Sequence, residues 1–243
     1  AYYDRWDVMY ALILAGGRGE RLRPLTDSIP KPMVPVNGKP LLWHQIIKLK
    51  GEGIKDFIIL CSYLWESIRD HFGDGSGLGL RIQYSVEKTP LGRGGGLRQG
   101  MRLVPKTETS VISLNGDVLT DQSLEPLVTF HQQSGARATM MLTPYPNSYG
   151  VVKVANEGQV LAFEEKAPLP FWIHAGFDIL DRDLETELPK LGDHETITLP
   201  RLATEGSLYG VKCHAFWQSI DGFKDLERAE EVLSQTKSTE QGG

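Results

Sequence analysis

The segment YALILAGGRGERLRPLTDSIPKPM, residues 10–33, places a glycine-rich loop directly after a short apolar run. The run YALIL has the length and the residue types of a buried strand. Gly16, Gly17 and Gly19 carry no side chain, so the backbone N–H groups of this loop can approach phosphate oxygens closely. Basic side chains along the segment are Arg18, Arg21, Arg23 and Lys31. The segment predicts a phosphate-binding loop after the first strand, and an ordinary tight turn with solvated arginines is the alternative.

Two other phosphate-binding motifs do not match this segment. A dinucleotide fingerprint needs a third glycine where Leu22 stands. A Walker A loop needs Ser or Thr after its Gly-Lys pair, whereas Gly38 and Lys39 are followed by Pro40. The loop therefore belongs to neither of these nucleotide-binding classes.

Outward from the loop, short apolar runs alternate with amphipathic stretches of helical length. The pattern predicts strands at residues 57–61, 81–86 and 111–117, and helices at residues 41–50, 65–72 and 95–104. Consecutive strand–helix units with short links are typical of a doubly wound α/β sheet. Ligands of such a sheet bind in the crevice outside the carboxyl ends of its strands.

The pattern of apolar and polar residues changes after residue 138. Segments 138–143, 150–154 and 159–165 alternate apolar and polar residues between turns, which predicts antiparallel strands that extend the same sheet. A strand at 174–181, helical structure within 183–205, a strand pair within 209–221 and a helix at 222–235 follow. We expect one domain over residues 9–236, an expression tag or extension at residues 1–8 and a frayed tail at residues 237–243.

The composition excludes several classes of protein. The 243 residues carry a net charge of −5 and lack a basic cluster, so no nucleic-acid partner is expected. No run of about 18 apolar residues occurs, so no membrane span is expected. Cys61 and Cys213 are far apart within apolar runs, which favours reduced core cysteines and a cytoplasmic location over a disulfide framework. The spacing of the histidines and cysteines predicts no zinc site.

LAGGRGERLRPLT followed by PKPMVPVNGKP resembles the signature of the sugar-1-phosphate nucleotidyltransferases, LAGGxGTRLxPLT followed by PKP. Glu20 stands where that family usually has Thr. The resemblance extends through LNGDVLTD, YGVVKV, FEEKAP, HAGFDIL and FWQSIDGFKDL, and so covers nearly the whole chain from Met9. It implies a Rossmann-like, doubly wound mixed sheet in three αβα layers. It also implies magnesium-dependent transfer of a nucleoside monophosphate from an NTP to a sugar-1-phosphate, with release of pyrophosphate.

The resemblance assigns residues to the nucleotide. Arg21 would hold the departing pyrophosphate, and Lys31 would lie beside the α-phosphate. Nucleotide-binding positions would be Leu14, Ala15, Gly16, Gly17, Gly19, Pro90, Gly92, Gly95 and Asn115. Gly94, Gly95 and Gly96 also fit a flexible loop.

Two aspartates are candidate Mg²⁺ ligands. Asp117 follows the strand predicted at 111–117, where the open-sheet rule places a ligand group, although a turn-forming role is the alternative. Many relatives carry the second aspartate in W-x-D-I-G-T, at the position of Ser219. The cytidylyl branch has FWQ-x-x-D-T instead, and that alignment selects Asp221. An aspartate there also suits a cap for the last predicted helix.

The acceptor sugar phosphate would contact Tyr149, Gly150, Glu165, Lys166 and His174, according to the resemblance. Glu165 would accept hydrogen bonds from sugar hydroxyls, and Lys166 would pair with the phosphate. His174 replaces the usual Asn and so implies a different sugar contact. A buried strand histidine satisfied by backbone is the alternative.

The nucleobase stays open at this point. PLGxGG resembles the guanylyl and heptose-phosphate branches, whereas FWQSID resembles the cytidylyl branch, so GTP and CTP are both candidates. A homodimer is possible. The competing function is a non-catalytic regulatory homologue that binds a nucleotide-sugar, which the departures at Glu20, His174 and Ser219 motivate.

Overall fold

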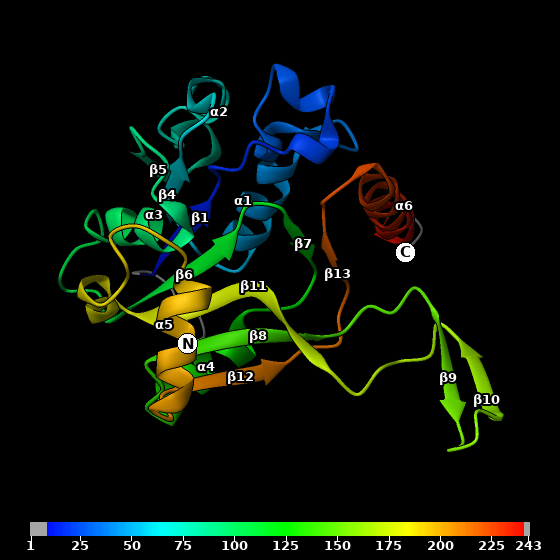
Figure 1. The fold of residues 1–243 in the computed structure, drawn as a ribbon. Coiled ribbons are helices and arrows are strands. Elements are labelled where there is room, and N and C mark those ends of the chain that lie inside the picture. The colour runs from blue at the N-terminus through cyan, green and yellow to red at the C-terminus, as the bar shows by residue number, and fades with distance from the viewer. Residues whose placement is uncertain (1–8, 241–243) are drawn as a thin grey trace.

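A seven-stranded mixed sheet forms the centre of the chain (Figure 1). The computed structural model describes residues 9–240, and side chains up to residue 235. The extension predicted at residues 1–8 and the last three residues of the predicted tail therefore lie outside the described residues. In spatial order the strands are β12 (Leu208–Lys212), β8 (Ala138–Pro144), β11 (Trp172–Asp181), β6 (Ser110–Asn115), β1 (Tyr10–Leu14), β4 (Asp56–Cys61) and β5 (Arg81–Val86).

The strand order is that of a doubly wound sheet. β1 pairs in parallel with both β4 and β6, and β4 pairs in parallel with β5. β11 runs antiparallel to both of its neighbours, β6 and β8, while β12 is parallel to β8. The chain starts at β1, builds outward to β5, and returns to the other side of β1 with β6. This reversal leaves a crevice at the carboxyl ends of β1 and β6.

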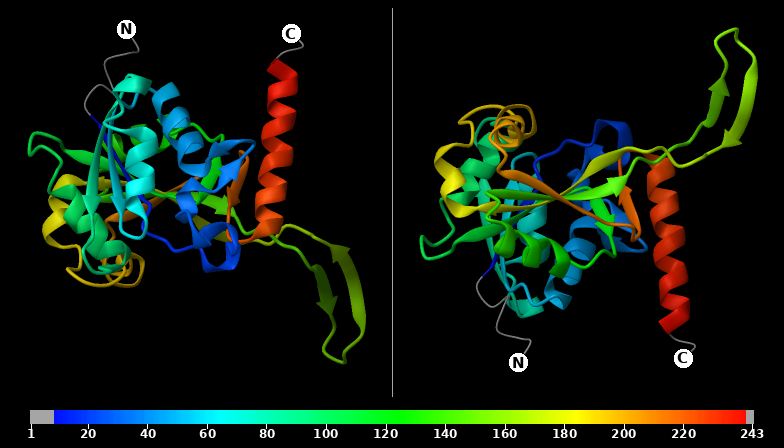
Figure 2. Two further views of the ribbon diagram at one scale, coloured as in Figure 1. Left: turned by 90° about the horizontal axis from the view of Figure 1, so that it is seen from above. Right: turned by 90° about the horizontal axis from the view of Figure 1, so that it is seen from below.

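Helices cover both faces of the sheet, which gives three layers (Figure 2). One face packs against α1 (Leu41–Gly51), α2 (Trp65–Phe72) and α4 (Glu125–Ser134), and the other against α3 (Gly92–Met101) and α5 (His194–Thr204). Within β1, Ala11 and Ile13 enter the first apolar cluster, whereas Leu12 enters the second. Alternate side chains of a strand point to opposite faces, so a sheet covered on both sides has continuously apolar strands. The predicted three-layer α/β fold is confirmed.

The glycine cluster at the start of the helix predicted at residues 95–104 is helical, and the helix begins three residues earlier, at Gly92. Gly94, Gly95 and Gly96 belong to α3, so the flexible-loop alternative is wrong. A Cβ at Gly94 would lie 2.6 Å from Cγ of Pro189, and one at Gly100 would lie 2.2 Å from Cδ2 of Leu60. Glycine therefore lets α3 approach its neighbours more closely than a side chain would allow, and this packing outweighs the low helix propensity of glycine.

The strands predicted as a pair within residues 209–221 do not pair with each other. β12 joins the edge of the main sheet, whereas β13 (Trp217–Ser219) pairs with β7 (Val118–Thr120). The backbone hydrogen-bonding groups at the edge of each strand pair with a strand that is distant in sequence. The helix α6 (Phe223–Glu240) then follows and runs beyond residue 235, where the sequence predicts its end.

A two-stranded arm projects from the body of the molecule (Figures 1 and 2). It consists of β9 (Gly150–Val154) and β10 (Val160–Glu165), which pair only with each other in the described sheets. The prediction that these two strands extend the main sheet is therefore wrong. Two cross-strand pairs, Val152 with Phe163 and Val154 with Val160, are exposed to between 44% and 64%. The arm has no layer packed upon it among the described residues, which is why it stands apart from the sheet.

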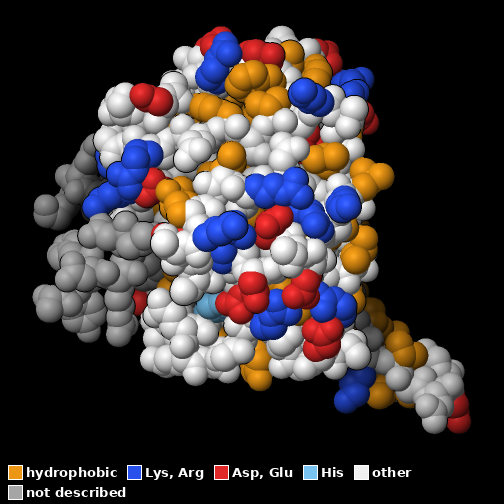
Figure 3. Space-filling view, turned by 90° about the vertical axis from the view of Figure 1, so that its left-hand side faces the viewer, with side chains coloured by type: hydrophobic (Ala, Val, Ile, Leu, Met, Phe, Trp, Pro, Cys, Tyr) orange, Lys and Arg blue, Asp and Glu red, His pale blue; other side chains and the backbone are white. Residues whose placement is uncertain are grey.

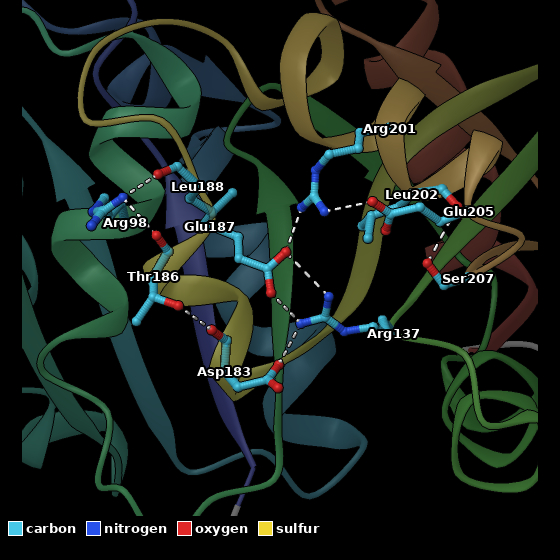
Figure 4. A network of polar contacts seen from close by, with 10 residues as sticks. All are labelled: Arg98, Arg137, Asp183, Thr186, Glu187, Leu188, Arg201, Leu202, Glu205 and Ser207. Atoms are coloured by element: carbon cyan, nitrogen blue, oxygen red, sulfur yellow. Dashed lines mark hydrogen bonds and ion pairs between the residues drawn. The ribbon is translucent and has the colours of Figure 1, made fainter.

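An ion-pair network joins the start of β8 to η5 (Arg182–Thr186) and α5 (Figure 4). Glu187 accepts hydrogen bonds from Arg137, at 2.7 Å from Nη2, and from Arg201. These bonds outweigh burial and lower the pKa of Glu187 from 4.5 to about 2. A carboxyl group whose pKa is lowered by folding stabilises the fold above its unfolded-state pKa.

Glu187→Gln should therefore lower the free energy of unfolding at pH 7 by about 1 kcal/mol, a value reduced by solvent screening at this surface. The difference from the wild type should be lost as pH falls from 4.5 through about 2. Thermal melts followed by circular dichroism over this pH range would check it. Glu205→Gln, which removes the bond to Arg201 only, is the matched control. A difference between Glu187→Gln and wild type that did not change with pH would contradict the assignment.

The surface carries interleaved charges where Figure 3 shows it, with Lys and Arg side chains beside Asp and Glu. Cys61 and Cys213 are both buried and free, as predicted. Among the described residues, no helix has the length and apolar character that crossing a bilayer requires.

Candidate active site

A cleft of about 580 Å³ opens at the carboxyl ends of β1, β4 and β6 and at the start of α3. Its position is the crevice that the doubly wound topology predicts. Of the predicted nucleotide-binding residues, the cleft is lined by Leu14, Gly16, Gly17, Pro90, Gly92 and Asn115. The others, Ala15, Gly19 and Gly95, do not line it. Ala15 is buried and donates its N–H to Leu60, and a Cβ at Gly95 would lie 2.7 Å from the carbonyl oxygen of Lys190.

The glycine loop after β1 presents backbone to this cleft. No atom that the structure describes, apart from those of Gly17 and its chain neighbours, lies within 4 Å of a Cβ built at Gly17, so the space above it is open. Gly19 has a different function. Its φ is +65°, and a Cβ there would lie 2.9 Å from both Cβ of Lys31 and Cγ2 of Thr26. Gly19 thus lets the loop turn tightly enough to pack against Lys31.

Four charged residues from distant parts of the chain meet beside the cleft. Lys31, on the short helix η3 (Lys31–Met33), donates from Nζ to Oδ2 of Asp117 at 2.7 Å and to Oδ1 of Asp221 at 3.2 Å. Arg21, on η1 (Glu20–Leu22), donates to the same oxygen of Asp221 at 3.0 Å. The side chain of Lys31 is 11% exposed, whereas that of Arg21 is 76% exposed. The structure therefore brings together the residues predicted as catalytic and the residues predicted as metal ligands.

Apolar packing and backbone bonds hold this cluster in place. Leu22 and Val34, which flank the two basic residues, are buried with Leu119, Ile220 and Ala229 of the β7, β13 and α6 region. The N–H of Ile220 donates to the carbonyl oxygen of Asp117 at 2.8 Å. The cluster is thus fixed by the same contacts that join the loop segment to the last helix.

Gln45 fixes the turn that contains Asp117. Its amide is buried on α1, and Nε2 donates to the carbonyl oxygens of Asn115 and Val118, each at 2.7 Å. These two bonds hold the turn from either side. No sequence motif pointed to Gln45, because its function depends on α1 packing beneath the turn.

Asp221 does not cap the last helix. The N–H groups of Asp221 and Gly222 both donate to Oδ2 of Asp225 in the first turn of the helix, at 2.9 and 2.8 Å, whereas the carboxylate of Asp221 accepts from Arg21, Lys31 and Ser219. Burial alone would raise the pKa of Asp221, but Lys31, Arg21 and the hydroxyl of Ser219 lower it. The carboxylate of Asp221 is therefore held in its charged form next to Asp117.

The two carboxylates suit a divalent cation of the magnesium type. Both contact the same Lys31 Nζ, so they converge on one small volume. The described residues hold no group of three or more His, Cys, Asp or Glu side chains arranged for a metal ion. Mg²⁺ is usually held by one or two carboxylates, with water and substrate phosphates as the remaining ligands. The donor set fits such an ion and does not fit a metal enclosed by protein ligands alone.

Comparisons with known proteins identify the family of this chain. The family model described as "Nucleotidyl transferase" matches residues 10–230. The chain belongs to the nucleotidyl transferase family. It is 35% identical over 226 residues to mannose-1-phosphate guanylyltransferase of Mycobacterium tuberculosis, a match that covers 90% of this chain and 62% of that protein. It is 32% identical to UTP–glucose-1-phosphate uridylyltransferase of Synechocystis, over 91% of this chain and 62% of that protein.

The fold is shared with a solved structure. The structure of HddC from Yersinia pseudotuberculosis superposes with a TM-score of 0.75 at 24% identity, covering 93% of this chain and 99% of that one. The chain spans 62% of the length of the two sequence relatives above.

The residues predicted to bind the sugar phosphate lie mainly at the base of the arm. Tyr149 is 80% exposed, and its carbonyl oxygen accepts hydrogen bonds from Nδ2 of Asn147 and the N–H of Lys166. Gly150 and Glu165 face each other across the two strands. Within the described residues, none of these four arm positions lines the 580 Å³ cleft.

His174 lies away from the arm residues. Its Nε2 is 3.0 Å from Oδ1 of Asp178, and its Nδ1 is 3.6 Å from Oε1 of Glu195 on α5. The histidine is therefore paired with carboxylates. The alternative in which backbone satisfies it is wrong.

The sequence prediction missed several residues of the cleft. Ser62, Tyr63, Glu87 and Lys88 follow the ends of β4 and β5, and Arg93 lies in the first turn of α3. A general rule could have found the first four, because side chains that follow parallel strands gather at one edge of the sheet. Arg93 could not be found in this way, because the helix was predicted to begin only at residue 95 and the structure begins it at Gly92.

Proposed function

We propose that this chain transfers a nucleoside monophosphate from an NTP to a sugar-1-phosphate and releases pyrophosphate. The observation that carries the proposal is the position of Lys31 Nζ between Asp117 and Asp221, at the side of the cleft. A lysine between two carboxylates suits a reaction in which phosphate groups and a divalent cation must meet. The names of the two sequence relatives support the same class of reaction.

The residues of this chain position charge and need form no covalent bond to the substrate. The NTP would lie in the cleft, with its phosphates over the backbone of the glycine loop. An oxygen of the sugar phosphate attacks the α-phosphorus, and the bond from this phosphorus to the oxygen bridging the β-phosphate breaks. Lys31 and Arg21 would stabilise the negative charge that develops on the leaving pyrophosphate. In-line positioning of the two substrates would supply the remaining part of the rate enhancement.

Asp117 and Asp221 are the residues that would hold Mg²⁺. The ion, when bound, supplies positive charge next to the reacting phosphates. With Asp117 and Asp221 bound to it, Lys31 would be free to turn toward the substrate phosphates.

A substrate panel tests the function. The purified chain is incubated with Mg²⁺, each NTP in turn and a set of sugar-1-phosphates, and pyrophosphate release is measured. We expect release with at least one pairing. No release from any pairing would overturn the proposal, and tight binding of a nucleotide-sugar in calorimetry without turnover would favour the regulatory homologue.

Glu87 indicates a guanine nucleotide. Its carboxylate lines the cleft, and Oε2 accepts the N–H of Leu91 at 2.8 Å, which fixes its orientation. A carboxylate has lone pairs left for further donors, and guanine presents its N1–H and N2 amino group side by side. Uracil and thymine offer one N–H between two acceptors instead. Glu87 thus favours GTP over UTP and dTTP, and the name of the guanylyl relative supports GTP over CTP.

Glu87→Gln should reduce the preference for GTP. An amide offers one acceptor and one donor in place of two acceptors, so the ratio of kcat/KM for GTP to that for UTP should fall by about 10-fold to 100-fold. Steady-state kinetics with both triphosphates would measure the ratio. Lys88→Met, also in the cleft wall, is the control and should change both values together. An unchanged ratio in Glu87→Gln would remove Glu87 from base selection.

Other parts of the proposal concern the sugar and the setting. Tyr149, Gly150, Glu165 and Lys166 stay the predicted contacts of the sugar phosphate. A homodimer, a cytoplasmic location and the absence of a nucleic-acid partner stay predictions.

A further inference from the structure

We infer that His174 is a positioning residue for the nucleotide cleft and not a ligand of the sugar, and that it acts through Glu195 on Arg93. The inference rests on the proposed function, because it assigns the residue to one of the two substrates. It reverses the assignment that the sequence resemblance implies for His174.

A continuous chain of charged side chains leads from the sheet to the cleft. Asp178 and His174 lie on β11, with 3.0 Å between Oδ1 and Nε2. His174 Nδ1 lies 3.6 Å from Oε1 of Glu195, and the same oxygen accepts from Nη1 of Arg93 at 2.6 Å. Arg93 Nε also donates to Oδ2 of Asp193 at 2.8 Å. The chain therefore links the strand β11, the start of α5 and the start of α3.

The charges along this chain alternate in sign. The side chain of Asp178 is 3% exposed and that of His174 is 20% exposed, so both lie largely out of water. Burial alone would lower the pKa of His174, but Asp178 and Glu195 raise it to about 10. His174 is thus an imidazolium at neutral pH, between two carboxylates. Without it, Asp178 and Glu195 would be left as neighbouring anions in a poorly solvated place.

The neighbouring His194 shows that burial does not cause the raised pKa of His174. It is more deeply buried than His174, and burial lowers its pKa by more than Asp178, Glu195 and Asp193 raise it. Within the described residues, neither Nδ1 of His194 nor Nε2 of His174 has a partner in hydrogen-bond geometry. His174 lies between two carboxylates of the chain, whereas the ion pair of His194 is with Asp193, 3.6 Å from its Nδ1.

The far end of the chain forms part of the cleft wall. Arg93 and Gly92 both line the cleft. The N–H of Gly94 donates to the carbonyl oxygen of Gly192 at 2.9 Å, and a Cβ at Gly92 would lie 2.6 Å from that same oxygen. The first turn of α3 and the loop before α5 thus pack as one unit. A guanidinium has five N–H donors, so Arg93 keeps donors for acceptors on a nucleotide while two carboxylates hold it.

His174 itself faces α5. It lines a small apolar cleft with Met140, Glu195, Leu199 and Ala203. Further along the strand, the carbonyl oxygen of Ala175 accepts from Nε1 of Trp217, and Gly176 lies against the side chain of Asn115. A substitution at His174 should consequently be felt by the nucleotide through Arg93, and the sugar phosphate should not sense it.

Three variants break the chain at successive points: His174→Asn, Glu195→Gln and Arg93→Met. Each should raise KM for the NTP by about tenfold, the effect of losing one charge-assisted hydrogen bond. KM for the sugar-1-phosphate and kcat should stay within about twofold of wild type. Arg93→Lys, which keeps the charge, should recover part of the loss. His71→Asn, at an exposed position of α2, is the control and should leave both KM values unchanged.

Two readouts do not depend on turnover. Calorimetry of Mg-GTP binding should show the same tenfold loss of affinity in His174→Asn and Glu195→Gln. Nitrogen-15 NMR should show the His174 ring doubly protonated at pH 8 in the wild type, and its pKa should fall in Glu195→Gln. If wild type lacks turnover, the proposed function fails while these measurements still decide the inference. A rise in KM for the sugar-1-phosphate alone, or unchanged nucleotide affinity, would overturn it.

Discussion

Asp117→Asn should reduce turnover by on the order of 10³ or more, the scale on which preorganised charges act in such sites. Asp117 bonds Lys31 at 2.7 Å and lies beside Asp221, so the change removes one of two negative charges that would hold Mg²⁺. The fold should survive, because an amide oxygen can still accept from Lys31 and the side chain is 31% exposed. Pyrophosphate release and the circular dichroism melt, measured on the same sample, check both parts.

A neighbouring aspartate provides the control for this variant. Asp121→Asn changes the same residue type four positions along, at the far end of β7 and outside the cluster, and should keep near-normal turnover. Near-normal turnover in Asp117→Asn at saturating Mg²⁺ would remove Asp117 from the mechanism. A large drop in melting temperature would instead show that its contact with Lys31 is structural.

Lys31→Met should have an effect of similar size, about 10³ in kcat. Lys31 is the cation that Asp117 and Asp221 share, and its side chain is 11% exposed. Methionine keeps much of the packing against Gly19 but supplies no charge to the reacting phosphates. Steady-state kinetics at increasing Mg²⁺ would show whether the metal can replace it.

The Mg²⁺ dependence separates two possible functions of Lys31. If the lysine acts on the substrate, kcat stays low at every Mg²⁺ concentration, as we expect. Full recovery of kcat at high Mg²⁺ would show that Lys31 serves only to neutralise the two carboxylates. Lys39→Met removes a positive charge from the exposed strand β3 (Lys39–Pro40) and should leave kcat unchanged.

Many of the strands and helices could be predicted from local residue patterns in the sequence. The strands at β4, β5 and β6 and the helices α1 and α2 begin and end within one or two residues of their predicted bounds. Each is encoded by apolar periodicity and by glycines at its ends, which act over a few residues. The strand partners of β12 and β13 could not be found in this way. The backbone N–H and C=O groups at the edge of a strand are the same in every strand and do not specify a partner. The pairing therefore depends on how distant elements pack.

The helical glycines of α3 illustrate the same limit. Read alone, three consecutive glycines favour a loop, because glycine loses more backbone entropy in a helix than other residues do. The structure has a helix there, because Gly94 and Gly100 admit Pro189 and Leu60 at distances that a Cβ would block. The information that decides this lies in residues up to about a hundred positions away.

The sequence by itself determined the α/β class, the crevice at the end of the first strand, and the candidacy of Arg21, Lys31 and Asp117. These depend on residue types at fixed spacing along a short stretch of chain. Only the tertiary structure shows which side chains Asp221 contacts, because an aspartate just before a helix suits a cap and a ligand equally well. Its carboxylate meets a lysine 190 positions away, and its N–H donates to Asp225 in the first turn of the helix. Likewise, only the packing of α5 against β11 brings Glu195 next to His174, which the sequence resemblance predicts as a sugar contact. Charges act through space, and the fold alone sets which of them are near.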